Sequence, residues 1–334
     1  MNKKIENENK TKEDIKKSKD TNINKSNTIE NSQNNEKQEL LDIKNDYVFK
    51  RTFGYKGDEE VTKVLLRDIL GMKVNEIDLD VNPITEKELM DDKLGIMDIA
   101  SVVNDNVQVD IEMQVVNKNN IEKRIMYYWN AYYQKSISKG DDYGELKRTI
   151  IILIADFEIK GIEQAKKYFT EWEIREKDYS ELILTDVLKI CIIELPKYIE
   201  YKVNNPNLNL WTEFLENPEV VNMSEKDIEN EKDESLKTTK KAIKQAKNTL
   251  EQISKDKHEQ ELARLRKKYI MDQNAIQEYG YCRGIEEGVE IGKNDGIQFE
   301  KIETAKKMLA KKMPIDVIIE ITGLSKEEIE KIKN

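Results

Sequence analysis

The chain has 334 residues and a formal net charge of −10 at pH 7. Charged residues make up 37% of the sequence and hydrophobic residues 38%, so a packed core cannot extend along the whole chain, and part of it must be solvated helix or disordered tail. The longest apolar run, around residues 150–155, is too short to cross a bilayer. The opening MNKKIENENK lacks the apolar stretch of a signal peptide. We therefore expect a cytoplasmic protein that neither spans a membrane nor is exported through a signal peptide.

Cysteine and histidine are scarce, which limits the chemistry. Two cysteines, Cys191 and Cys282, exclude a disulfide framework, and the single His258 excludes a multi-histidine metal site. His258 falls in a charged helical stretch, and nothing near either cysteine in the sequence would activate a thiolate. The acidic balance argues against nonspecific coating of nucleic acid, but it leaves room for a local basic groove.

Composition divides the chain into four segments. Residues 1–39 form a tail rich in Asn and Lys with almost no apolar side chains, and we expect it to be disordered. Residues 40–222 carry a changing apolar pattern and are expected to form the main domain. Residues 223–298 are expected to form a charged helical segment, and residues 299–334 a small helix-turn-helix-like module.

Within the main domain the spacing of the apolar residues switches between the helical and the alternating period. The order of helix, three strands, helix and strand indicates an α/β or α+β layout. Beyond it, residues 160–222 are expected to continue as helices with one strand over 188–195. The other predicted elements are one or two helices over 40–71, a helix over 120–138, and strands over 74–81, 94–103, 107–115 and 149–159, with turn residues at 104–106.

The charged segment carries two patterns. Apolar residues between 224 and 280 form one stripe, which predicts an amphipathic helix or hairpin. Glycine then recurs every four residues from Gly280 to Gly296. Each glycine costs a helix about 1 kcal/mol, so five would melt an isolated helix. We expect a neighbouring backbone to pack closely along this stripe, with a hinge as the alternative.

The end of the chain has clear helix signals. Pro314 fits the start of one helix and Gly323 its end, and Ser325 with Glu328 forms a capping box for one more helix. The last helix is about as acidic as it is basic, which suits a groove-reading helix poorly. We favour a compact packing or oligomerisation module over a DNA-reading one.

The clearest alternation in the chain lies in residues 107–115. Its apolar side chains point into a core, and Asp110, Glu112 and Gln114 point to the other side. The short turn before it lets the preceding strand pair with it, which brings Asp98 beside Glu112 or Gln114. Two facing carboxylates repel, and a divalent ion removes that cost because Mg²⁺ is held by one or two carboxylates plus phosphate oxygens and waters. The pattern fits a phosphodiester-hydrolysis site at Asp98 and Glu112, but the spacing by itself favours the alternative, an acidic face exposed to water.

The helix over 120–138 is rich in aromatic residues. Such residues can stack on bases, but their spacing favours packing of the helix against the sheet. The cluster comprises Tyr127, Tyr128, Trp129, Tyr132 and Tyr133.

Three stretches carry a resemblance to a known family: NDYVFKRTFG (45–54), DDKLGIMDIA (91–100) and VDIEMQ (109–114). They resemble the PD-(D/E)XK nuclease family transposases, also called recombination-promoting nucleases. The resemblance continues into the C-terminal segments and covers most of the chain after residue 40. It implies a restriction-endonuclease-like core of the α/β (α+β) class, with a mixed β-sheet flanked by helices, followed by a helical C-terminal region.

The resemblance also implies roles for single residues. Asp98 and Glu112 match the metal-binding residues of the family. Gln114 stands where the wider superfamily most often has Lys; it can position the attacking water but brings no charge. The missing cation would come first from Arg124, which matches the helix motif of the family and can fork onto a phosphate, and second from Lys93.

Other residues of the matching stretches have open roles. Lys50, at the end of the first motif, and Lys123 are further candidates for the missing cation. Asp46 and Phe49 match the opening motif, Phe49 as a core residue and Asp46 as a support of the site or a helix cap.

The implied function is a Mg²⁺-dependent DNA endonuclease, with Mn²⁺ as an alternative ion, that cleaves phosphodiester bonds by water attack, releases a 3′-hydroxyl and promotes recombination. Its partners would be DNA and a second copy of the chain in a dimer, and no membrane. The alternative is a catalytically weak or inactive nuclease-fold protein for DNA binding or assembly, favoured by the absent lysine and the net acidity. A toxin-like or defence nuclease would share the same chemistry.

Overall fold

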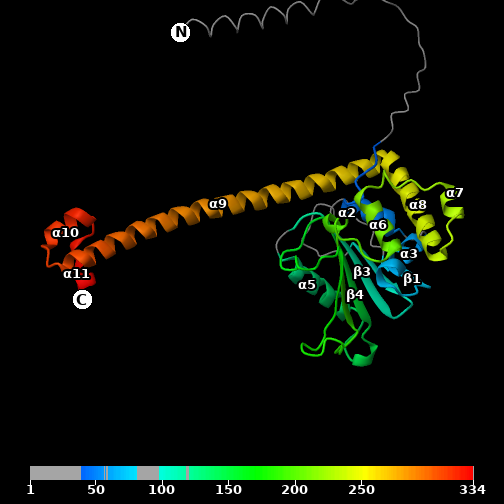
Figure 1. Cartoon of the computed structure of the whole chain (residues 1–334), viewed down its shortest axis with the longest axis horizontal. Coiled ribbons are helices and arrows are strands. Elements are labelled where there is room, and N and C mark those ends of the chain that lie inside the picture. The colour runs from blue at the N-terminus through cyan, green and yellow to red at the C-terminus, as the bar shows by residue number, and fades with distance from the viewer. Residues whose placement is uncertain (1–38, 56, 58, 81–97, 118–119, 334) are drawn as a thin grey trace, which may run out of the picture. The chain divides into compact units, whose positions relative to one another are not determined.

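The computed structural model describes residues 39–333 except 56, 58, 81–97 and 118–119 (Figure 1). Lys93 and all but the last residue of the predicted disordered tail lie outside this part of the chain.

The centre of the described structure is a mixed β-sheet with the strand order β1-β2-β3-β4-β6-β5. The pairs β3–β4 and β4–β6 are parallel, and the other neighbouring pairs are antiparallel. This sheet confirms the predicted fold class. The strands are β1 (Ile77–Asp80), β2 (Ile99–Val103), β3 (Val107–Gln114), β4 (Arg148–Ala155), β5 (Phe169–Trp172) and β6 (Leu188–Glu194).

The predicted β2–β3 hairpin forms around Asn104 and Asp105. Both residues have positive φ, 47° and 63°, a conformation that Asn and Asp tolerate better than other side chains. The side-chain oxygen of Asn104 also accepts hydrogen bonds from the main-chain N–H groups of Asn75 and Glu76, just before β1. The turn therefore fixes the hairpin and the entry of the edge strand together.

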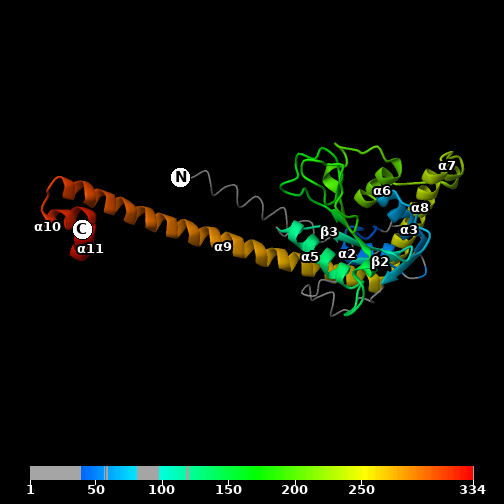
Figure 2. The same ribbon diagram turned by 90° about the horizontal axis from the view of Figure 1, so that it is seen from below.

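One face of the sheet is covered by α2 (Asp46–Phe53), α3 (Glu59–Leu70), α6 (Pro206–Glu216) and α8 (Glu234–Lys255). The apolar residues of β3 point into this main core, as predicted. Helices α3 and α8 run side by side in both views (Figure 1, Figure 2). The buried carboxylate of Asp68 joins three of these helices: it accepts hydrogen bonds from Trp211 Nε1 at 2.9 Å, from the Thr239 hydroxyl at 2.7 Å and from Arg67 of its own helix at 2.6 Å.

The other face of the sheet is covered by α5 (Ile121–Gln134). Ile121 and Ile125 of this helix pack on Ile151 and Leu153 of β4 in a second, smaller core. The side chains of β3 that alternate with its apolar set face this side. The carboxylates of the strand therefore lie between the sheet and α5.

The prediction of helices over residues 160–222 is wrong for most of that range. Residues 160–205 contain β5, β6 and irregular backbone with the short 3₁₀ turn η2 (Leu195–Lys197), and the α-helix α6 begins only at Pro206. Strand β5 is a four-residue edge strand. A strand of that length shows too few alternations to be recognised by periodicity.

The charged segment forms α7 (Glu225–Glu229), α8 and α9 (Lys257–Ala310). The apolar stripe of α8 is buried as predicted, and Asp256 separates α8 from α9 by capping the N–H groups of His258 and Glu259. Close packing along the glycine stripe is not found within the described chain. A Cβ added at any of the glycines from Gly280 to Gly296 would meet no atom within 4 Å, and the helix runs through them without a break.

The end of α9 packs with α10 (Ile315–Thr322) and α11 (Lys326–Lys333) around a separate small core. Gly323 ends α10 with a φ of 67°, and Ser325 and Glu328 exchange the two hydrogen bonds of the predicted capping box. No helix in the described part of the chain has the length and apolar character needed to cross a membrane.

Candidate active site

Strand β3 presents three polar side chains to the underside of α5. Asp110 is fully buried, Glu112 is 3% exposed and Gln114 is half-buried. The alternation of the strand places Val109, Ile111 and Met113 in the main core, so the three polar side chains point to the opposite face of the sheet. The predicted acidic face therefore lies under a helix and away from water along most of its length.

Asp98 lies directly before β2 and reaches the same place. Ile99 pairs with Ile111, so Asp98 stands opposite Glu112 in the antiparallel register. Its Oδ2 accepts a hydrogen bond of 2.8 Å from the main-chain N–H of Met113. The structure thus brings Asp98 and Glu112 together, as the spacing predicts, and joins them with Asp110 in one carboxylate cluster (Asp98, Asp110 and Glu112).

The carboxylate cluster is electrostatically costly. Burial raises the pKa of all three carboxyl groups well above their usual range. Mutual repulsion adds to this effect: the charge of Glu112 raises the pKa of Asp98, and that of Asp98 raises the pKa of Asp110. Within the described part of the chain, both carboxylate oxygens of Asp110 and Oε1 of Glu112 are buried and accept no hydrogen bond of good geometry. A cluster with this many unpaired oxygens needs protons or a cation.

These unpaired oxygens fit a hard divalent cation. The described residues contain no group of three or more histidine, cysteine or acidic side chains that could hold a metal ion by themselves. Mg²⁺ does not require one, because it is bound through one or two carboxylates and completes its shell with waters and phosphate oxygens. The residues that could hold it are Asp98 and Glu112, with Asp110 behind them.

Gln114 and Arg124 form a chain of hydrogen bonds at the end of the cluster. Gln114 Nε2 donates to Glu112 Oε2 at 3.3 Å, and its Oε1 accepts from Arg124 Nη1 at 3.2 Å. Arg124 also donates to the hydroxyl of Tyr128 at 3.0 Å, one helical turn further along α5. The guanidinium lowers the pKa of Glu112, against the larger effect of burial. The structure therefore brings together four of the five predicted site residues, and the fifth, Lys93, is not described.

Helix α2 supplies two more charged side chains near the cluster, Lys50 and Asp46. Lys50 is only 8% exposed, and its charge lowers the pKa of both Asp98 and Asp110. Asp46 lies one turn earlier, raises the pKa of Asp98 and forms a bidentate ion pair with Arg266 of α9, with contacts of 2.8 and 2.5 Å. Nothing in the local sequence around Arg266 indicates this contact, because 220 residues separate the pair.

The aromatic residues of α5 divide between packing and exposure. Tyr132 is buried and donates to the Ser101 carbonyl, and Trp129 donates to the Thr149 carbonyl, which holds the helix on the sheet as predicted. Tyr127, in contrast, is 67% exposed. Of the cluster, it is the side chain open to a base.

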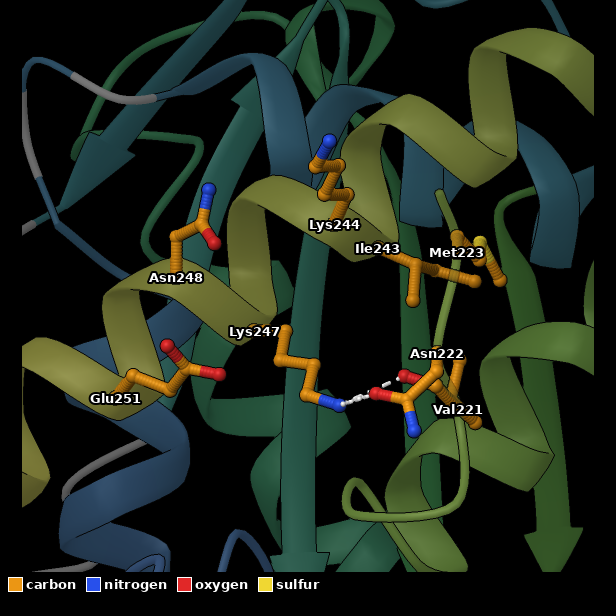
Figure 3. A pocket seen from close by; sticks show the side chains of 8 residues that line it. All are labelled: Val221, Asn222, Met223, Ile243, Lys244, Lys247, Asn248 and Glu251. Atoms are coloured by element: carbon orange, nitrogen blue, oxygen red, sulfur yellow. Dashed lines mark hydrogen bonds between the residues drawn. The ribbon is translucent and has the colours of Figure 1, made fainter. Parts of the chain in front are cut away.

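A surface pocket of about 170 Å³ lies elsewhere, between α8 and the segment before α7 (Figure 3). Lys247 crosses it and donates to the Val221 carbonyl and the Asn222 side chain, both at 2.8 Å. None of the predicted site residues lines it. The pocket is therefore not part of the candidate site.

A mixed sheet flanked by helices, with an acidic β-hairpin at its centre and a Glu-x-Gln sequence in the second strand, defines a nuclease domain of the PD-(D/E)XK class. The chain belongs to the PD-(D/E)XK nuclease family transposases, whose family model matches residues 43–280. A second model, the C-terminal HTH domain of the Rpn/YhgA-like nuclease family, matches residues 298–334, which include α10 and α11. Comparisons with curated proteins and with solved structures found no match.

Proposed function

We propose that this protein is a metal-dependent DNA endonuclease that hydrolyses phosphodiester bonds and whose breaks promote recombination. The observation that carries the proposal is the carboxylate cluster, whose buried oxygens at Asp110 and Glu112 have no hydrogen-bond partner among the described residues. Membership of the nuclease family supports the same reaction class. The matching HTH domain supports DNA as the partner.

In this proposal Asp98 and Glu112 would hold one Mg²⁺ or Mn²⁺ ion, and the ion would supply activation of water and neutralisation of the phosphate charge. Gln114 hydrogen-bonds the attacking water and is itself oriented by Arg124. The guanidinium of Arg124 steadies the phosphate by its positive charge. The water oxygen forms a bond to phosphorus, the bond from phosphorus to O3′ breaks, and O3′ leaves as a hydroxyl after taking a proton.

The test is a cleavage assay on supercoiled plasmid with Mg²⁺, with Mn²⁺ and with EDTA. We expect nicking that needs the metal and is lost in Asp98→Ala. Asp78→Ala is the matched control, because Asp78 is an exposed carboxylate on the neighbouring strand β1. Cleavage that persists in EDTA, or equal cleavage by the Asp98 variant, would contradict the proposal. Wild-type protein that binds DNA without cutting it would favour the assembly function instead.

Cleavage of both strands would require two active sites, and we propose a dimer for this reason. Sedimentation equilibrium of the full chain, with and without a duplex, tests it. A monomer at all concentrations, still linearising plasmid in a single binding event, would contradict the dimer without affecting the nuclease.

A further inference from the structure

The superfamily lysine is replaced here by Gln114, so the charge it would bring has to come from elsewhere in the chain. Four described cations lie near the cluster by sequence or by their charge: Lys50, Lys123, Arg124 and Lys135. Lys135 lowers the pKa of Asp110, but its side chain is exposed and lies over the Tyr132 ring. Lys123 is exposed on α5. Arg124 is engaged with Gln114 and Tyr128. Lys50 differs from the other three, because it is almost fully buried. It forms no ion pair with any described residue.

The place of Lys50 is set by the end of helix α2. Gly54 closes this helix, and a Cβ added there would lie 2.9 Å from the Lys50 carbonyl oxygen and 3.4 Å from both Lys50 Cγ and Ile99 Cγ1. The stem of Lys50 therefore runs beside the residue that follows Asp98. Burial of an ammonium group is unfavourable without anionic neighbours. The charge of Lys50 lowers the pKa of both Asp98 and Asp110, so the ammonium lies within electrostatic range of these two carboxyl groups without an ion pair to either.

Asp46 is a second carboxylate near the ammonium group of Lys50. It precedes Lys50 by four residues in α2, the spacing at which an acidic and a basic side chain meet on one helix face. Yet the carboxylate of Asp46 is taken up by Arg266, whose guanidinium contacts both oxygens while the two side chains are 17% and 15% exposed. The carboxylate of Asp46 is therefore paired with Arg266, and no ion pair joins it to Lys50 in the described residues.

We propose that Lys50 supplies the positive charge that Gln114 lacks at the reacting phosphate, and that Arg266 of α9 acts as a positioning residue by holding Asp46 away from Lys50. This inference rests on the proposed nuclease function and assigns two residues to it. It also makes the beginning of α9 a functional part of the nuclease site.

The first test is kinetic. Lys50→Met should lower kcat by about 10²–10³-fold, the usual loss when one preorganised electrostatic contact to the transition state is removed. DNA affinity measured in Ca²⁺ should change less than threefold, because one phosphate contact among many is lost. Lys50→Arg should recover part of the rate. A Lys50→Met protein that is folded and cleaves within threefold of wild type would overturn the catalytic role.

The second test separates positioning from mere support of the fold. Arg266→Met should lower kcat about tenfold, and the double variant Asp46→Asn/Arg266→Met should restore most of the rate, because the competing carboxylate is gone. Arg264→Met is the control, since Arg264 is 61% exposed two residues away on α9. A double variant no faster than Arg266→Met, or an Asp46→Asn variant that cannot cleave, would overturn the positioning role.

A third readout does not depend on cleavage. In protein labelled with ¹³Cε-lysine and free of metal and DNA, the Lys50 signal, assigned by its loss in Lys50→Met, should shift in Arg266→Met and return in the double variant. Wild-type protein that cannot cut DNA would overturn the nuclease function and the catalytic part of this inference. A Lys50 signal that ignores Arg266→Met would overturn the positioning part alone.

Discussion

Arg124 donates a hydrogen bond to the side-chain oxygen of Gln114, and the side-chain N–H of Gln114 donates one to Glu112. A lysine at position 114 could still donate to Glu112, but it could not accept from Arg124, because an ammonium has no acceptor and would face the Arg124 guanidinium. The glutamine is therefore matched to the arginine. The two residues are best understood as one unit.

The first prediction follows from this pair. Gln114→Lys, which restores the usual superfamily residue, should lower the cleavage rate at least tenfold, because it removes the acceptor of Arg124 and adds a like charge beside it. Single-turnover rates on a short duplex measure the effect. A faster Gln114→Lys enzyme would show that the Arg124–Gln114 bond has no catalytic value.

Arg124 itself should be more sensitive than its neighbour. We expect Arg124→Gln to reduce the single-turnover rate about 10²-fold, since a charge-assisted contact to the phosphate and the anchor of Gln114 are both lost. Lys123→Gln is the control, because Lys123 is exposed and adjacent in sequence. Equal effects of the two substitutions would indicate that only the net charge of α5 matters.

The buried carboxyl group of Asp110 should make the free energy of unfolding depend on pH. Its pKa is raised, so above about pH 4 the folded protein holds a proton that the unfolded chain releases, and stability falls as pH rises from there through the raised pKa. Asp110→Asn removes this loss. In EDTA we expect the variant to be about 1–3 kcal/mol more stable than wild type at pH 8, with the advantage shrinking toward pH 4, as measured by urea unfolding. An advantage that does not vary with pH would contradict a raised pKa.

The same cluster should bind metal without DNA. Millimolar Mg²⁺ should raise the Tm of the wild-type protein by a few degrees, because a ligand that binds only the folded state stabilises it. Asp98→Asn and Glu112→Gln should each abolish the shift, and Asp78→Asn should keep it. A shift that survives in both cluster variants would place the metal elsewhere.

The hydrogen bonds to the buried Asp68 carboxylate join helices of the main core and lie outside the candidate site. Asp68→Ala leaves Trp211, Thr239 and Arg67 without their shared acceptor, and we expect a loss of about 3–5 kcal/mol in urea unfolding. Glu60→Gln, on the exposed side of the same helix, should cost less than 1 kcal/mol. A small loss in Asp68→Ala would mean that water replaces the carboxylate.

Local patterns predicted the parts of this structure that depend on neighbouring residues. The alternation over residues 107–115 predicted β3 and its acidic face, and the turn residues Asn104 and Asp105 predicted the hairpin that carries Asp98 to Glu112. These features need only side-chain periodicity and backbone preference. The resemblance to the family then turned a common acidic hairpin into a candidate active site.

Long-range contacts could not be predicted in this way. The pairing of Asp46 with Arg266 and of Arg51 with Glu259 joins residues more than 200 positions apart, and neither leaves a pattern in the sequence. The burial of Lys50 escaped for the same reason, since it depends on how α2 meets β2. The short edge strand β5 was missed because its neighbour β6, and not its own composition, makes it a strand.

The hydrogen bonds and ion pairs between α2 and α9 also matter while the protein is being synthesised. Asp46 leaves the ribosome early, but Arg266, and Glu259 with which Tyr47 and Arg51 bond, emerge more than 200 residues later. At the usual pace of translation, 5–20 residues per second, the interval is on the order of ten seconds or more. During that time the carboxylates of the hairpin exist without the partner that organises α2 beside them. The nascent chain therefore completes the surroundings of its acidic centre only after residue 266 has been made, so the order of synthesis delays the formation of the finished site.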